Sequence, residues 1–312
     1  MTCRLVAGLI FTVGAWQLLC RLPAARAETL TLDSAIESVD WTALNDLDLS
    51  AFGNLDEEQA RAICRQLQER FQGEYVLELA PLRQVAVAVV PLLEQHADTR
   101  PYAAWLRARL DYFEVADTLR VVIPAPHLDL RPAPLPPVNP TPEWERRVWV
   151  EHLRQEPAPT RAESFVARLK PIFLAEQVPP ALVWLAEVES GFDPQARSPL
   201  GAAGLFQLMP FTAEFMGLEL RPHDQRLDPL KNARAAAQYL KYLHEKFHDW
   251  RLSLAAYNAG EGRVWRLIEK YSSRKYDDLA LHLPAETQLY VPKIEATLLR
   301  REGVALTDLG AR

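Results

Sequence analysis

Cysteine is scarce in this chain, at 3 of 312 residues. Cys3 and Cys20 lie in the first 27 residues, and Cys64 stands alone after them. A single cysteine cannot form an internal disulfide, and no cysteine cluster could hold zinc. Disulfide-stapled and zinc-finger folds are therefore excluded beyond residue 27, and we expect neither a metal nor an organic cofactor. Apolar residues at helical spacing around Cys64 predict a buried thiol.

Positive charge is also in deficit, with 35 lysines and arginines against 41 aspartates and glutamates. The net charge is −6, and removal of the first 27 residues with Arg4, Arg21 and Arg26 would bring it to −9. A chain this acidic argues against nucleic acid as a partner.

An apolar run at residues 5–19 is too short for a comfortable membrane span. Arg4 precedes it, and the alanines at positions 25 and 27 are the small residues that a signal peptidase reads. We therefore expect residues 1–27 to be a secretory signal. The alternatives are a retained anchor or a lipidated Cys20, although lipoprotein signals place a small residue before that cysteine and here it is a leucine.

Helical patterns continue on both sides of a proline-rich segment. In an N-terminal helical domain, residues 28–123, the expected helices cover residues 56–72, 82–96 and 101–119. Its aromatic residues recur at helical spacing, which predicts core packing: Tyr102, Trp105, Tyr112 and Phe113. Eight prolines crowd into residues 124–142 and predict an extended linker, because such a segment lacks the donors for a helix or a central strand.

After the linker, residues 143–305 carry dense helical signals and no convincing strand, so the fold class is predicted to be all-α. The expected helices cover residues 144–155, 161–177, 181–190, 232–248, 251–257, 263–271 and 285–301. Residues 306–312 are left as a tail, and we find no internal repeat.

The functional argument rests on Glu189. It continues an apolar stripe of Leu182, Leu185 and Ala186, whereas Glu187 lies about 200° round the helix. Burial and the negative end of the helix dipole both raise the pKa of such a carboxyl group. A carboxylic acid that keeps its proton near neutral pH suits a general acid for an ether-like leaving group. The alternative is a solvated glutamate at a helix end.

The residues that follow Glu189 favour a site. Gly191 permits a chain reversal, and Gly204 lets the backbone approach a ligand closely. Gln207 offers an amide donor and acceptor that suit an N-acetyl group or a hydroxyl. Asp193 precedes a proline, so a turn or capping role is expected rather than a second catalytic carboxylate.

Four short motifs follow one another between about Pro179 and Glu302. They are Glu189-Ser190, Gly204-Leu205-Phe206-Gln207, Ala256-Tyr257-Asn258-Ala259-Gly260 and Glu286-Thr287-Gln288-Leu289-Tyr290-Val291. Each motif alone is weak, but all four in this order and spacing are specific. Together they resemble the family-1 lytic transglycosylases, and within that family the membrane-bound lytic transglycosylase D type.

The resemblance implies a goose-type, lysozyme-like α fold and cleavage of the β-1,4 bond between N-acetylmuramic acid and N-acetylglucosamine in peptidoglycan glycan strands. Glu189 would protonate the leaving oxygen and then, as a base, take the proton of the C6 hydroxyl that closes a 1,6-anhydro ring. Most glycosidases use two carboxylates, and no second one has an obvious catalytic place here.

The same resemblance assigns substrate-binding positions to Ser190, Gly204, Phe206, Gln207, Tyr257, Asn258, Glu286 and Tyr290. Among these, Glu286 is a candidate auxiliary carboxylate, and Tyr290 is a candidate hydrogen-bond partner of Glu189 or of the substrate. Phe206 departs from the methionine that is common in the family, which leaves the shape of the subsites open. Packing alone is the alternative for Tyr257 and Tyr290.

Two other functions stay open at this level. A hydrolytic lysozyme would use the same fold with water as the nucleophile, and a non-catalytic protein would bind peptidoglycan or assist envelope assembly. The N-terminal domain is a candidate surface for an envelope protein. Export across the inner membrane would place the chain in the periplasm or cell envelope, with membrane association if an anchor or lipid is kept.

Overall fold

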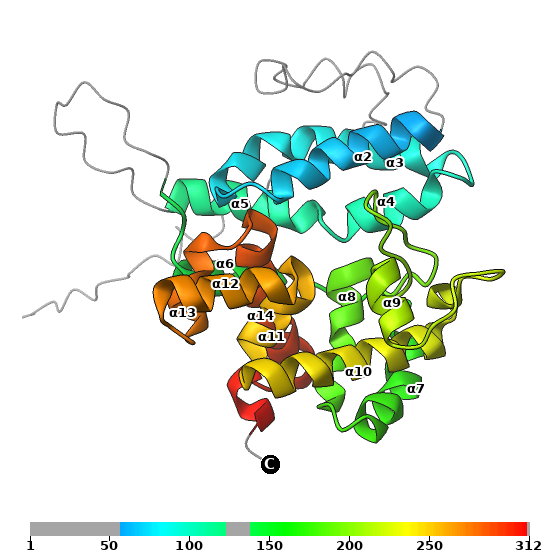
Figure 1. Cartoon of the computed structure of the whole chain (residues 1–312). Coiled ribbons are helices and arrows are strands. Elements are labelled where there is room, and N and C mark those ends of the chain that lie inside the picture. The colour runs from blue at the N-terminus through cyan, green and yellow to red at the C-terminus, as the bar shows by residue number, and fades with distance from the viewer. Residues whose placement is uncertain (1–56, 123–137, 311–312) are drawn as a thin grey trace, which may run out of the picture. The chain divides into compact units, whose positions relative to one another are not determined.

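The computed structural model of the chain describes residues 57–122 and 138–310, all within one compact unit. The expected signal peptide and most of the expected linker lie outside these ranges. The described residues form helices joined by turns, and their β features are isolated bridges at Ala203. The all-α prediction is confirmed for this part of the chain (Figure 1).

The helices follow one another along the chain in two groups. The first group comprises α2 (Glu57–Phe71), η2 (Val76–Leu82), α3 (Arg83–Glu94), α4 (Arg100–Arg107) and α5 (Leu110–Val122). The second comprises α6 (Pro142–Leu153), α7 (Ala162–Ala175), η3 (Pro180–Trp184), α8 (Leu185–Ser190), α9 (Pro210–Phe215), η4 (Gln225–Leu227), α10 (Pro229–Phe247), α11 (Trp250–Ala259), α12 (Glu261–Tyr271), α13 (Tyr276–Leu279), η5 (Ala280–His282), α14 (Ala285–Glu302) and η6 (Leu306–Gly310).

Most expected helices occur in place, with two differences. The one expected over residues 181–190 is the 3-10 helix η3 followed by the short helix α8, and the one expected over residues 101–119 is two helices. Helix α4 ends at Arg107 and α5 begins at Leu110, with a tight turn in which the Arg109 amide donates to the Leu106 carbonyl at 2.9 Å. The apolar spacing continues across the break and so gives no sign of it. The turn directs Arg109 inward, where only 6% of the residue is exposed.

The end of the expected linker also differs from the prediction. Pro142 is the first residue of α6, and Thr141 before it has an extended backbone, as an N-cap residue should. Proline suits this position because its fixed φ fits the first helical turn and its missing N–H would have had no partner. The division of the chain into domains at residues 124–142 stays a prediction.

One buried apolar cluster includes residues from both helical groups. Tyr112 of α5 packs edge-on against Trp149 of α6 with ring centroids 5.5 Å apart. The four aromatic residues expected in the core are all buried, which confirms that prediction. Cys64 is also buried, as expected, and burial raises the pKa of its thiol to about 12.

Within the described residues, Val76–Glu94 is long and apolar enough to cross a membrane. It corresponds to η2 and α3, and it contains two prolines, Pro81 and Pro91. More than half of it is buried inside the protein. A core helix gives the same signal, and the packing of this stretch explains its composition.

The loop between α8 and α9 is fixed by groups that come from later in the chain. Arg226 donates to the carbonyl oxygens of Gly201 and Leu208 at 2.7 and 2.9 Å. Asn232 of α10 accepts from the Phe206 amide at 2.8 Å and donates to the Ala203 carbonyl at 3.3 Å. The loop therefore has a defined shape although it carries almost no regular structure.

We predict that Gly204→Ala destabilises the protein much more than Gly217→Ala. Both glycines have positive φ, +85° and +82°. A Cβ on Gly204 would overlap the Arg226 carbonyl oxygen and come within 2.6 Å of the Asn232 amide nitrogen, whereas one on Gly217 would meet nothing within 4 Å beyond its chain neighbours. Urea unfolding should show a loss of about 1–2 kcal/mol for Gly217→Ala and a clearly larger one for Gly204→Ala; equal losses would contradict the close approach.

Candidate active site

Glu189 lies in the last turn of α8, and the helix stops one residue after it. Gly191 adopts a left-handed conformation with φ of 60°, and the Phe192 amide donates to the Ala186 carbonyl at 3.0 Å. These are the features of a glycine-terminated helix end. The apolar stripe that precedes Glu189 is buried, and Glu189 itself is only 4% exposed.

Two side chains hold the Glu189 carboxyl group. The Tyr290 hydroxyl donates to Oε1 at 2.5 Å. The Arg109 guanidinium lies 3.9 Å from Oε2 and also donates to the Glu189 main-chain carbonyl at 3.4 Å. Helix α14 and the α4–α5 turn thus fix the carboxyl group from two directions.

Burial is the main cause of the raised pKa of Glu189. Loss of water raises the pKa of Glu189 to about 7, and the charge of Glu286 adds to the rise. Arg109, Tyr290 and Lys293 act in the opposite direction, because a positive charge or a donated hydrogen bond stabilises the carboxylate. At neutral pH the group is therefore poised between its acid and its base form.

Glu286 is the nearest second carboxylate, and its oxygens are occupied. Arg109 Nε donates to Oε1 at 2.9 Å. Gln68 of α2 and Gln72, the residue that follows this helix, donate to Oε2 at 3.0 and 3.3 Å. The residue is only 2% exposed. Glu286 therefore balances the charge of Arg109 inside the protein and has no free oxygen directed at a ligand.

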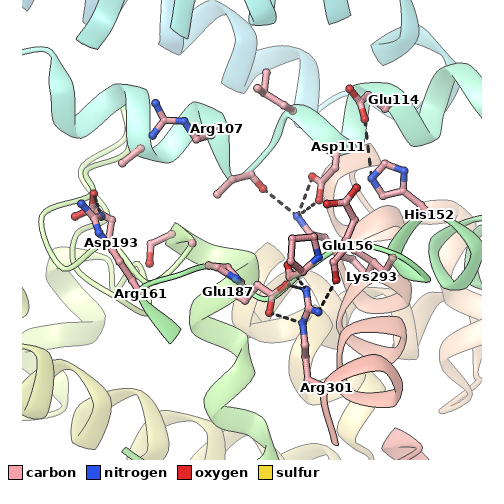
Figure 2. Close-up of a pocket in the computed structure, with 18 residues that line it drawn as sticks. Arg107, Asp111, Glu114, His152, Glu156, Arg161, Glu187, Asp193, Lys293 and Arg301 are labelled. Carbon is pink, nitrogen blue, oxygen red and sulfur yellow. Dashed lines mark hydrogen bonds and ion pairs between the residues drawn. The ribbon is translucent and has the colours of Figure 1, made fainter. Parts of the chain in front are cut away.

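Glu187 faces the opposite side of α8 from Glu189, as the helical spacing predicts. It pairs with Arg301 of α14 and borders a cavity of about 380 Å³, whose lining includes Ser190 and Lys293 (Figure 2). The charged groups around this cavity neutralise one another: Lys293 binds Asp111, Arg161 binds Asp193, and Arg301 binds Glu187.

Asp193 has the turn role expected of it. Its Oδ1 accepts from the Gln195 amide at 2.9 Å, and its other oxygen pairs with Arg161. It lines the cavity of Figure 2 together with Glu187, and Glu189 is not among the residues that line this cavity.

Four of the predicted substrate-binding residues build the loop after α8. Ser190 donates to the Leu205 carbonyl at 2.7 Å, and Gln207 donates to the Gly204 carbonyl at 2.9 Å. Phe206 is fully buried with its ring centroid 5.4 Å from that of Phe173. A sugar contact by the Phe206 ring does not fit this burial. The ring packs in the core, and the Phe206 amide donates to Asn232 Oδ1 at 2.8 Å.

Tyr257 and Asn258 lie at the end of α11 and are partly exposed. The Tyr257 hydroxyl donates to the Phe206 carbonyl at 2.7 Å, and Asn258 Oδ1 accepts from the Thr287 hydroxyl at 2.6 Å. Both side chains are thereby oriented, and both keep surface that a ligand can reach. Of the predicted contacts they are the most accessible.

Sequence reasoning missed two cations. Arg109 pairs with Glu286, and Lys293 donates to Ala108 and Asp111 on either side of Arg109. A signal was present for each of them. Arg109 lies on the aromatic stripe of its segment, and Lys293 follows Glu286 and Tyr290 at i+7 and i+3 on one helical face.

Residues 174–280 match the family described as the transglycosylase SLT domain. This match covers Glu189, the glycine loop and the Tyr257-Asn258 pair. This segment is similar to the SLT domain. Glu286 and Tyr290 lie beyond the matched residues, and Arg109 lies before them, so the site is completed by helices outside the match.

Several relatives are similar to the SLT domain and its surroundings. Over 140 residues the chain is 40% identical to "Membrane-bound lytic murein transglycosylase D" of Escherichia coli K12, covering 44% of this chain and 31% of that protein. Over 121 residues it is 42% identical to "Soluble lytic murein transglycosylase" of the same strain, covering 36% and 19%. The matched part is thus less than a third of either relative.

Among solved structures, the 70-kDa soluble lytic transglycosylase in complex with bulgecin A aligns with 85% of this chain and 48% of its own. The TM-score is 0.42 and the identity 22%. The Slt lytic transglycosylase of Pseudomonas aeruginosa gives a TM-score of 0.41 at 19% identity. Scores at this level do not establish a shared architecture for the whole chain.

We predict that Tyr290→Phe and Arg109→Met each raise the pKa of Glu189 above its value of about 7, because each removes a group that stabilises the carboxylate. Carbon-13 NMR titration of the Glu189 carboxyl carbon, assigned with Glu189→Gln, measures it directly. Tyr276→Phe, which removes another buried hydroxyl, is the control and should leave the titration unchanged. A lowered pKa in Tyr290→Phe would contradict the assignment.

A second prediction concerns stability. The pKa of Glu189 is about 7 in the folded protein, against an ordinary value of 4.5 for a glutamate. Protonation therefore favours folding, and the folded state loses stability as pH rises from 4.5 to 7. Glu189→Gln removes this dependence. The free energy of unfolding of the variant, relative to that of the wild type, should therefore rise by about 3 kcal/mol across that range. Urea unfolding at pH 4.5 and pH 8 measures the difference, and a constant difference would contradict the raised pKa.

Proposed function

We propose that this chain is a peptidoglycan lytic transglycosylase in which Glu189 acts alone, first as acid and then as base. The observation that carries the proposal is a difference between two buried carboxyl groups. Glu189 has a pKa of about 7, whereas both oxygens of Glu286 accept hydrogen bonds from protein side chains. A glycosidase with two working carboxylates needs both to face the scissile bond. Here Glu286 is bonded to Arg109, and Asp193 accepts from the Gln195 amide and pairs with Arg161.

In the first step, protonated Glu189 gives its proton to the glycosidic oxygen of the leaving N-acetylglucosamine as the C1–O bond breaks. The substrate's own acetamide stabilises the positive charge that develops at C1. The Tyr290 hydroxyl, 2.5 Å from Oε1, stabilises the carboxylate that results.

In the second step, the C6 hydroxyl of the muramic residue attacks C1, and Glu189 takes its proton. The products are a 1,6-anhydromuramoyl end and a free N-acetylglucosamine end, and the enzyme returns to its protonated form. A pKa near 7 suits both directions of proton transfer at the same pH. No water is consumed, which separates this reaction from that of a lysozyme.

Hydrolysis would need a base for the attacking water. The two carboxylates that the sequence offers as second candidates, Glu286 and Asp193, are paired with Arg109 and Arg161. The non-catalytic alternative gives no reason for a glutamate to be held buried beside a tyrosine and an arginine. The relatives are named lytic murein transglycosylases, which agrees with the proposed reaction.

The remaining parts of the proposal follow from the site. Tyr257 and Asn258 are the proposed sugar contacts, and glycan strands of the cell envelope are the proposed partner. The N-terminal helices complete the site through Arg109, Gln68 and Gln72, which gives them a role inside the enzyme. Docking of an envelope protein on the same helices is a separate proposal, which a pulldown with the full chain would test.

We expect wild-type protein to release anhydro-ended muropeptides from purified peptidoglycan, and Glu189→Gln to release none. Asp193→Asn is the matched control and should remain active, because the Asp193 oxygens serve a turn and the ion pair with Arg161. Mass spectrometry of the soluble products decides the matter. Reducing-ended products one water heavier would make the protein a lysozyme, and loss of activity in Asp193→Asn would give that residue a catalytic part.

A further inference from the structure

Five aromatic side chains form a row that begins at Tyr257 and ends on the surface of α9. In order they are Tyr257, Tyr239, Tyr242, Phe215 and Phe211, with successive ring centroids 5.5, 6.1, 5.7 and 6.4 Å apart. They come from α11, α10 and α9, which are segments separated in sequence. We call these five residues the aromatic row.

The outer part of the aromatic row is in contact with water. Phe211 is 79% exposed and Phe215 is 58% exposed, while the three tyrosines are partly buried. A phenylalanine that stays this exposed adds little to the stability of the fold. Exposed apolar groups that cluster, rather than scatter singly, mark binding surfaces.

The inner end of the aromatic row adjoins the proposed active site. Tyr257 is bonded to the Phe206 carbonyl, and it lies near enough to Glu189 for the carboxylate charge to influence its hydroxyl group. At the other end, α9 begins three residues after Gln207. The row is therefore a continuation of the site along one side and not a separate patch.

Polar groups flank the middle of the row. Lys246 Nζ lies 5.7 Å from the Tyr242 ring centroid and pairs with Glu261 at 3.0 Å. A saccharide presents apolar C–H faces together with a rim of hydroxyl and amide groups. Aromatic rings with polar neighbours complement that pattern, and their neutral character makes no demand for a charged ligand.

We propose that the aromatic row is an extended glycan-binding platform, on which successive sugars of a β-1,4-linked N-acetylhexosamine strand stack as they lead into the site at Glu189. The identity of the sugar rests on the proposed function. The ring-to-ring steps are of the order of one sugar unit, so a linear chain meets a new ring at each step. Binding therefore depends on the length of the glycan.

The experiment uses the full chain carrying Glu189→Gln and N-acetylglucosamine oligomers of increasing length, from the dimer to the hexamer. Isothermal titration calorimetry gives the affinity for each oligomer. We expect affinity to rise with length, and Phe211→Ala/Phe215→Ala to bind the hexamer about tenfold more weakly while the dimer is little changed. Phe211→Ala alone changes a side chain that is mostly exposed to water. It should weaken the binding of the longest oligomers first.

Tyr271→Ala is the matched control, since Tyr271 is an exposed aromatic residue, 38% accessible, that is not in the row. It should bind every oligomer as its parent does. Equal affinities for parent and double variant at all lengths would overturn the platform. The platform would also be overturned if the double variant changed the oligomeric state of the protein, measured by sedimentation, and left glycan affinity unchanged. The row would then be a contact between copies of the chain.

The failure of this inference can be told apart from the failure of the proposed function. Anhydro-ended products without length-dependent binding would leave the transglycosylase standing and remove the platform. Length-dependent binding that needs Phe211 and Phe215, in a protein whose wild type makes no anhydro ends, would keep the platform and remove the reaction.

Discussion

The Arg109 guanidinium lies between two buried carboxyl groups, 2.9 Å from that of Glu286 and 3.9 Å from that of Glu189. A lone charge in this position would be prohibitively costly, and two acids without a cation would repel each other. The pairing is unequal because Glu286 takes the direct hydrogen bond. Glu189 is left with a distant cation and one tyrosine hydroxyl. This inequality separates the two roles: Glu286 stays with its donors, and Glu189 can exchange a proton near pH 7.

Three helical segments are needed for that arrangement. Helix α8 brings Glu189, the α4–α5 turn brings Arg109, and α14 brings Glu286, Tyr290 and Lys293 on one face. Lys293 binds the chain on both sides of Arg109 and so keeps the turn in place. The break between α4 and α5 thus accompanies the placement of Arg109 beside both carboxyl groups.

The loop after α8 shows a similar dependence on distant residues. Its glycine at position 204 is required because backbone and amide groups from residues 226 and 232 occupy the space of a side chain. Ser190, Phe206 and Gln207 keep the loop in shape, and Tyr257 is bonded to it. Residues that the sequence motifs suggest as substrate contacts thus act largely by positioning those that remain accessible.

The sequence by itself determined the helical class, most helix positions, the similarity to lytic transglycosylases and the burial of Glu189, because apolar spacing and short motifs are local properties. It also indicated that Glu187 and Glu189 lie on different faces of one helix. Only the tertiary structure decided which of the two carboxyl groups takes the direct hydrogen bond from Arg109. Glu286 and Glu189 are the same residue type, and the difference arises from Arg109, which is 80 and more residues away. Likewise, Phe206 became a core residue and five scattered aromatic residues became a row, because helix packing and not sequence distance sets which side chains meet.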